Sequence, residues 1–364
     1  MEAKANAPER VLSIDIFRGV TMFLLMAEAS GLYRALSPRL FENSFLITLF
    51  SQVHHHPWNG LHFWDLIQPY FMFIVGLSLP FAVKSRIKKG HTQKQIFHHV
   101  LRRSMILLLL GWYDYCIGPG RIGWRFQDVL SQIAFTYLVA YLVMNRSFKF
   151  QVIFSLSLLI LNDVIYQIFW VEGFNQAWVN GHNFGNWLDR LVGSRSSWAS
   201  FNAVPTAAHT IWGVLAGKLL MSDQKVFDKL KKLVIAGAIL VVVGYLMDPI
   251  VPIIKHIATS SFVIVSGGWT LLTLALFFWI ADIKNWTKGW PLFFGVVSMN
   301  SLFIYVFFEF GGARFFERII HPLTYTLFEW GGEVTTAAIT SVLVLAAMWG
   351  LCYFMYKKRV FIKI

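Results

Sequence analysis

Charged residues are scarce in this sequence, in which Asp, Glu, Lys and Arg make up 14% of the 364 positions. A soluble globular protein carries about 25%, and most of this chain consists instead of apolar runs separated by polar stretches. A helix satisfies its backbone hydrogen bonds internally and crosses the hydrocarbon core of a bilayer in about 20 residues. The sequence therefore predicts an all-α, polytopic integral membrane protein, with a single domain over residues 1–364 in the lipid bilayer.

Cysteine is almost absent, and so are the short motifs of common soluble enzymes. Cys116 and Cys352 each lack a CxxC partner, which argues against a disulfide scaffold or a thiolate metal site. The sequence contains no Walker loop, no GxGxxG, no GxSxG and no HExxH. The chemistry must therefore be sought in the polar residues that interrupt or border the apolar runs.

Basic residues give the chain a formal net charge of +13. It has no long basic tail and no basic patch interleaved with aromatic residues, so we expect no nucleic-acid partner. The Lys and Arg residues form short clusters between apolar runs, and most of them lie inside if both termini are cytoplasmic. This pattern favours about ten transmembrane helices. They are expected at residues 11–33, 62–83, 101–118, 127–145, 150–171, 202–221, 232–248, 259–281, 290–310 and 334–356.

Ionisable residues inside membrane helices are costly unless they are paired or hydrated, so each is a functional candidate. Asp15 and Arg18 are three residues apart and share one helix face, where an ion pair is the simplest interpretation. Glu28 near the outer end of the same helix is either hydrated or functional. The set comprises Asp15, Arg18, Glu28, Asp65, Asp114, Asp163, His209 and Glu309.

The densest polar segment is HHHPWNGLHFWDLIQPYFMFIVG, residues 54–76, in a stretch expected outside the membrane. An imidazole can act as a base or nucleophile near neutral pH, and a nearby carboxylate can fix its tautomer. His55 and Asp65 form such a candidate pair; alternatively, the loop is only polar and Asp65 only favours a helix start. Adjacent histidines cannot all point at one ion, so we expect no metal.

Several motifs resemble those of the heparan-alpha-glucosaminide N-acetyltransferase family. They occur in the family's order from residue 13 to about residue 309 and cover most of the chain. The motifs are SIDIFRG, HHPWNGLHFWDLIQPYFMFIVG, RIGWRFQDVLSQIAFTYLVAY, NFGNWLDRLV, PIIKHIATSSFVIVSGG and SMNSLFIYVFFE.

This resemblance implies a membrane enzyme that moves an acetyl group from cytoplasmic acetyl-CoA to the amine of a glucosamine-type sugar. By analogy, the chain is a multi-pass protein of a bacterial inner (plasma) membrane and acts on an acceptor on the periplasmic side. The family's active histidine falls on His55, and the Asp of its D-L-x-x-P motif falls on Asp65. The resemblance implies acetyl-CoA as co-substrate, adds no metal, and leaves a homodimer open.

Further residues are candidates for binding the acceptor or CoA. Trp58 offers a stacking face to a sugar and Asn59 offers hydrogen bonds. Asn300 and Lys255 are candidate donors to a developing oxyanion. The remaining acceptor-side candidates are Glu28 and His209, and the CoA-side candidates are Asp15, Arg18, Arg102 and Arg103.

The chain departs from the family pattern in the expected acceptor pocket. Ala29 stands where the family has an Asn, with Glu28 beside it, and Phe308 stands where the family has a His, followed by Glu309. The segment FNAVPTAAHTIWG replaces another family motif. His209 within it is either a satisfied core histidine or a candidate substitute for the missing polar groups.

Two other functions fit the same polar residues. A membrane transporter would move a sugar or an ion past them, although no internal repeat supports that interpretation. An O-acetyltransferase of a surface polysaccharide would share the donor and the fold but would use a hydroxyl acceptor. A comparison of amine and hydroxyl acceptors separates O-acetyl transfer from N-acetyl transfer.

Overall fold

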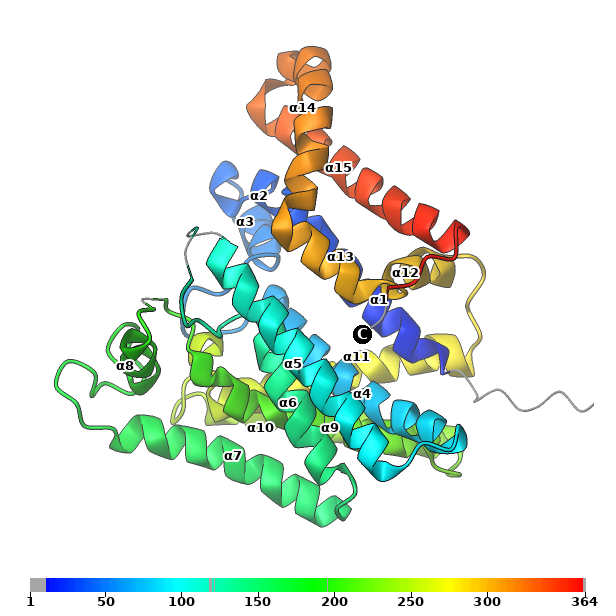
Figure 1. Cartoon of the computed structure of the whole chain (residues 1–364). Helices are drawn as coiled ribbons and strands as arrows, with labels where there is room; N and C mark the ends of the chain where they lie inside the picture. The colour runs from blue at the N-terminus through cyan, green and yellow to red at the C-terminus, as the bar shows by residue number, and fades with distance from the viewer. Residues whose placement is uncertain (1–10, 118–119, 121, 195, 363–364) are drawn as a thin grey trace, which may run out of the picture.

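Every regular element of the described chain is helical (Figure 1). The computed structural model describes residues 11–117, 120, 122–194 and 196–362. The only strand-like pairing within these ranges is an isolated antiparallel bridge between Asn59 and Ile254. The helices are α1 (Leu12–Ala29), α2 (Leu32–Ala35), α3 (Ser44–Ser51), α4 (Ile67–Lys88), α5 (Gln93–Ile117), α6 (Val129–Met144), α7 (Phe148–Ile168), α8 (Phe184–Leu191), α9 (Ala203–Met221), α10 (Val226–Met247), α11 (Ser260–Phe277), α12 (Trp290–Ser298), α13 (Ser301–Phe307), α14 (Ala313–Phe328) and α15 (Gly332–Lys357).

The expectation of an all-α, multi-pass membrane protein is confirmed. Each expected span overlaps a helix, although residue 118, the last of the span 101–118, lies outside the described residues. Five helical segments of the described chain are long and apolar enough to cross a membrane. The number of ten crossings and the cytoplasmic position of both termini stay predictions. The five segments are Phe63–Lys88, Phe148–Ile168, Val226–Met247, Ser260–Ile283 and Ser301–Lys357.

The structure differs from the expectation near the C-terminal end of the chain. The expected helix at 290–310 is divided, because α12 ends at Ser298 and α13 begins at Ser301. In addition, α14 occupies part of the segment 311–333, which was expected to be a loop. Polar residues interrupt its apolar residues, so α14 has no continuous apolar run that would have revealed it.

The central packing joins α4 to α9 through glycines. A Cβ atom on Gly76 would lie 1.9 Å from the carbonyl oxygen of Thr210, and one on Gly213 would lie 2.2 Å from that of Phe73. Gly217 completes a GxxxG spacing on α9, and a Cβ atom on it would lie 2.5 Å from the carbonyl oxygen of Leu77. Small residues at this spacing let helix backbones approach closely in a membrane.

Loops distant in the sequence meet at one end of the bundle. Gly60 donates its N–H to the carbonyl of Ile253 at 2.8 Å, and Ala199 donates to that of His256 at 3.0 Å. These contacts bring together the connections before α4, before α9 and before α11. At the other end, the start of α1 bonds to Asp282, which follows α11. The segment of residues 54–62 therefore lies at a junction of three loops.

Substitution of Gly76 by Ala should destabilise the fold. The added methyl group must displace the α9 backbone, and overpacking of this kind costs about 1–3 kcal/mol. Thermal unfolding in detergent measures the effect. Gly350→Ala is the matched control, because a Cβ atom there meets nothing within 4 Å. Equal melting temperatures for the two variants would contradict the close α4–α9 approach.

Candidate active site

The Asp65 carboxylate organises the histidine-rich loop. Asp65 lies in the 3-10 turn Phe63–Leu66 just before α4, and its side chain is 1% exposed. One oxygen, Oδ2, accepts the backbone N–H of His62 at 2.8 Å and that of His56 at 3.1 Å. The other, Oδ1, lies 2.9 Å from Nδ1 of His55. The acid thus folds the loop back over the start of α4 and fixes the His55 ring.

Lys255 adds a positive charge to this pair from a loop about 190 residues further along. Its Nζ atom lies 3.5 Å from Oδ1 of Asp65 and 3.1 Å from Nδ1 of His55, and its side chain is 6% exposed. Trp198 covers the ammonium at 5.3 Å from the ring centroid. The three groups therefore form one compact cluster.

Buried polar contacts hold the Lys255 loop in place. Asp163 on α7 accepts hydrogen bonds from the backbone N–H and the hydroxyl of Ser260, at the start of α11. Asn202 donates its amide to the carbonyl of His256 at 2.8 Å. Ala258 between them has a left-handed backbone with φ of 47°. The loop is thereby fixed from α7 and from the segment before α9.

The hydrogen bonds determine which nitrogen of His55 can react. An ionised Asp65 only accepts hydrogen bonds, so Nδ1–H of His55 and the Lys255 ammonium both donate to Oδ1. The two donors are close because they share this acceptor. With its proton on Nδ1, the neutral ring presents an unprotonated Nε2. The arrangement suits a base or nucleophile acting through Nε2.

The surroundings keep His55 neutral near physiological pH. Desolvation lowers the pKa of His55 below its usual value near 6.5, and the Lys255 charge lowers it further against the opposing effect of Asp65. Burial also lowers the pKa of Lys255 to about 8, although Asp65 opposes this shift. His256 stacks on Trp58 and packs against the tilted ring of Trp198, and its pKa is lowered to about 4, chiefly by desolvation. Of these two imidazoles, His55 is the one that Asp65 orients.

A cavity of about 180 Å³ lies beside His55. Three glutamines line one part of it: Gln68 donates to Gln132 at 2.5 Å, and Gln132 donates to the backbone carbonyl of Gln127 at 3.0 Å. Glu28 also lines it and accepts the indole N–H of Trp64 at 3.2 Å. The full lining is Leu25, Glu28, His55, Trp64, Ile67, Gln68, Phe71, Gln127, Val129, Gln132, Trp198, Lys255, Tyr305 and Glu309.

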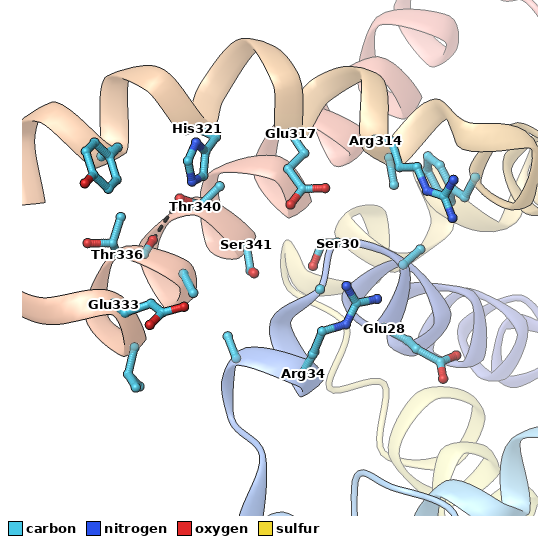
Figure 2. Close-up of a pocket in the computed structure, with 18 of the residues that line it drawn as sticks. Glu28, Ser30, Arg34, Arg314, Glu317, His321, Glu333, Thr336, Thr340 and Ser341 are labelled. Atoms are coloured by element: carbon cyan, nitrogen blue, oxygen red, sulfur yellow. Dashed lines mark hydrogen bonds between the residues drawn. The ribbon is translucent and has the colours of Figure 1, made fainter. Parts of the chain in front are cut away.

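A second, larger cavity of about 1090 Å³ shares Leu25, Glu28 and Glu309 with the first. Figure 2 shows side chains of α14 and α15 facing Glu28 and Arg34 across it. We call the smaller one the inner cavity and the larger one the outer cavity. The shared residues place the outer cavity next to the space beside His55.

Two curated proteins are similar to the chain over nearly its whole length. Heparan-alpha-glucosaminide N-acetyltransferase of human is 22% identical over 98% of this chain, and that of mouse is 22% identical over 100%. No protein-family model matches the sequence. The chain is a distant relative of these acetyltransferases. It spans 60% of the length of the human protein and 62% of that of the mouse protein.

Some residues proposed from the sequence line the inner cavity, and others do not. His55, Lys255 and Glu28 line it, and Asp65 lies directly behind His55. Gln68, Gln127 and Gln132 were missed, although the motifs that carried the family resemblance contain all three. Their signal was the presence of long amide side chains inside or beside apolar runs.

Three of the proposed acceptor contacts lie outside both cavities. Trp58 donates its indole N–H to the carbonyl of Trp178 at 2.7 Å, and Asn59 pairs through its backbone with Ile254. His209 is fully buried and bonds to the carbonyl of Val263 and the hydroxyl of Ser266, both at 3.0 Å. Trp58 and Asn59 thus support the loop junction, and His209 ties α9 to α11.

Asn300 and the proposed CoA contacts also line neither cavity. Asn300 donates to the carbonyl of Val360 at 2.9 Å, at the break between α12 and α13. Asp15 and Arg18 form an ion pair at 3.8 Å. Arg103 lies over a ring of α6, and Arg102 is exposed on α5. Roles for them in CoA binding stay predictions.

Substitution of Lys255 by Met should raise the pKa of His55. The change removes a positive charge that disfavours the imidazolium and leaves the Asp65 charge to favour it. The reaction rate of the His55 peptide with diethyl pyrocarbonate against pH, followed by mass spectrometry, reports this pKa because only the neutral ring reacts. The midpoint should move to higher pH.

The exposed residue Lys288 provides the control, as Lys288→Met. Its midpoint should match that of the unaltered protein. A midpoint that stays in place or falls in Lys255→Met would show that Lys255 does not act on His55.

Proposed function

We propose that the protein transfers an acetyl group from acetyl-CoA to the amine of a glucosamine-type sugar at His55. One observation carries the proposal: the Asp65-bound imidazole of His55 lines a cavity in a chain distantly related to N-acetyltransferases over nearly its full length. We further propose that the protein resides in a bacterial inner membrane, takes its donor from the cytoplasm and modifies its acceptor on the periplasmic side.

In the direct mechanism, the neutral amine attacks the thioester carbonyl in the inner cavity. A nitrogen–carbon bond forms, the carbon–sulfur bond breaks, and the amine proton passes to Nε2 of His55. The resulting imidazolium then protonates the CoA thiolate. Asp65 holds the required tautomer and stabilises the imidazolium, as the carboxylate of a catalytic triad does. The balance leaves an N-acetylated sugar and free CoA.

Lys255 and the amide side chains have supporting roles in this proposal. The buried Lys255 ammonium favours the developing negative charge on the carbonyl oxygen, where fixed positive groups are most effective in a dry site. Gln68 and Gln132 offer amide groups that suit sugar hydroxyls, whereas Asp189 and Ser194 hold the side-chain amide of Gln127. The inner cavity is too small for a drug-sized ligand, which takes about 300–1,000 Å³, so it suits the reacting groups alone.

In a two-step alternative within the same function, Nε2 of His55 attacks the thioester first. CoA leaves as the thiolate, and the amine then attacks the acetyl carbonyl and displaces Nε2. The proton that the amine loses passes through the freed Nε2 to the thiolate or to water. The unprotonated Nε2 supports both routes.

Substitution of His55 by Ala should abolish transfer of labelled acetyl from acetyl-CoA to glucosamine by the purified protein in detergent. Loss of a general base lowers a rate by about 10²–10⁴-fold. His91→Ala is the matched control, because His91 is exposed and lines neither cavity. Transfer by the unaltered protein to hydroxyl acceptors alone would instead favour an O-acetyltransferase. No turnover with either acceptor would favour a transporter.

The two-step route predicts a burst of free CoA when acetyl-CoA is added without an acceptor. The label should remain on the His55 peptide, and His55→Ala should show neither burst nor label. Stopped-flow detection of the thiol and peptide mapping provide the measurements. A protein that transfers acetyl to glucosamine without any burst would support the direct route.

A further inference from the structure

The outer cavity is acidic although the chain as a whole is basic. Five carboxylates line it, from Glu28, Glu309, Glu317, Glu329 and Glu333. Two guanidinium groups, from Arg34 and Arg314, oppose them, and His321 is the further titratable imidazole. The cavity thus gathers five of the 19 acidic residues of a chain whose net charge is +13. This concentration of carboxylates favours a cationic ligand.

One wall of the outer cavity comes from the amphipathic helix α14. On α14, Arg314, Glu317 and His321 point into the cavity (Figure 2). The opposite side of α14 exposes apolar residues at four-residue intervals, with Phe315 58%, Ile319 55% and Leu323 64% exposed. Within a membrane such a helix turns its apolar side to lipid. The low dielectric of that wall concentrates the field of the carboxylates inside the cavity.

The outer cavity adjoins the inner cavity, which His55 lines, at two shared carboxylates. Glu28 and Glu309 line both cavities, so a group that enters the inner cavity from the outer one passes them. Pockets for drug-sized ligands enclose about 300–1,000 Å³, and the outer cavity has about 1090 Å³. It therefore has room for several sugar units, while only the end of such a chain fits beside His55.

We propose that the outer cavity binds a polycationic oligosaccharide with free amines, such as an oligoglucosamine, and directs its terminal amine between Glu28 and Glu309 toward His55. This inference rests on the acetyltransferase proposal and adds a charge preference to it. Ammonium groups along the chain meet the carboxylates of α14 and α15. Acceptors that carry sulfate or carboxylate groups are repelled by the same field.

Binding measured without acetyl-CoA tests this inference separately from catalysis. The full chain in a non-ionic detergent is titrated calorimetrically with the glucosamine trimer, with the N-acetylated trimer, and with a sulfated glucosamine disaccharide. The cationic trimer should bind more tightly than the other two ligands, and its affinity should fall as salt is added, because salt screens exposed charges.

Two variants locate the binding site. Glu317→Gln and Glu333→Gln should each weaken binding of the trimer by about two- to fivefold, as expected for loss of one partly screened charge contact. Glu172→Gln is the matched control, because Glu172 is exposed and lines neither cavity. It should leave the affinity unchanged.

The inference is overturned if the N-acetylated or the sulfated ligand binds as tightly as the cationic trimer. It is also overturned if Glu317→Gln and Glu333→Gln bind the trimer as the control does. Tight, salt-sensitive binding of the trimer without any acetyl transfer would support the cationic site and reject the acetyltransferase proposal. Transfer to glucosamine without a preference for the cationic trimer would support the acetyltransferase proposal and reject the cationic site.

Discussion

The arrangement of the candidate site depends on the burial of one carboxylate. A buried charge is tolerated only with hydrogen bonds and a counter-charge, and Asp65 obtains both from two distant parts of the chain. His55 and the backbone of residues 56 and 62 come from the loop before α4, and Lys255 comes from the loop before α11. Removal of any one contact would leave the buried charge of Asp65 imperfectly compensated. The same requirement that holds the loops together also fixes the tautomer of His55.

Helix packing sets the positions of these loops. The glycine contacts between α4 and α9 bring their backbones close, and α9 in turn meets α11 through His209. The ends of these helices therefore converge, and their loops meet at one end of the bundle. Polar side chains that do not take part in this packing line the two cavities. The fold thus provides a closely packed base for the inner cavity and an amphipathic wall for the outer one.

The sequence predicted the local parts of this arrangement better than the distant ones. His55 and Asp65 are ten positions apart at a helix start, so chain geometry allowed the contact that the structure shows. Lys255 was proposed only as a donor to an oxyanion, because no local pattern relates it to His55. His209 was interpreted either as a core histidine or as an acceptor contact, because an apolar run gives no indication that its partners lie on α11. The helix α14 was missed because its amphipathic pattern contains no long apolar run.

The central claim is that an acetyl group is transferred beside Nε2 of His55. A cryo-electron microscopy structure with a non-hydrolysable acetyl-CoA analogue tests it most directly. We predict density for the acetyl carbonyl in the inner cavity, within contact distance of Nε2 and near Lys255. An analogue bound with its acetyl group away from this cavity, at saturating concentration, would contradict the account.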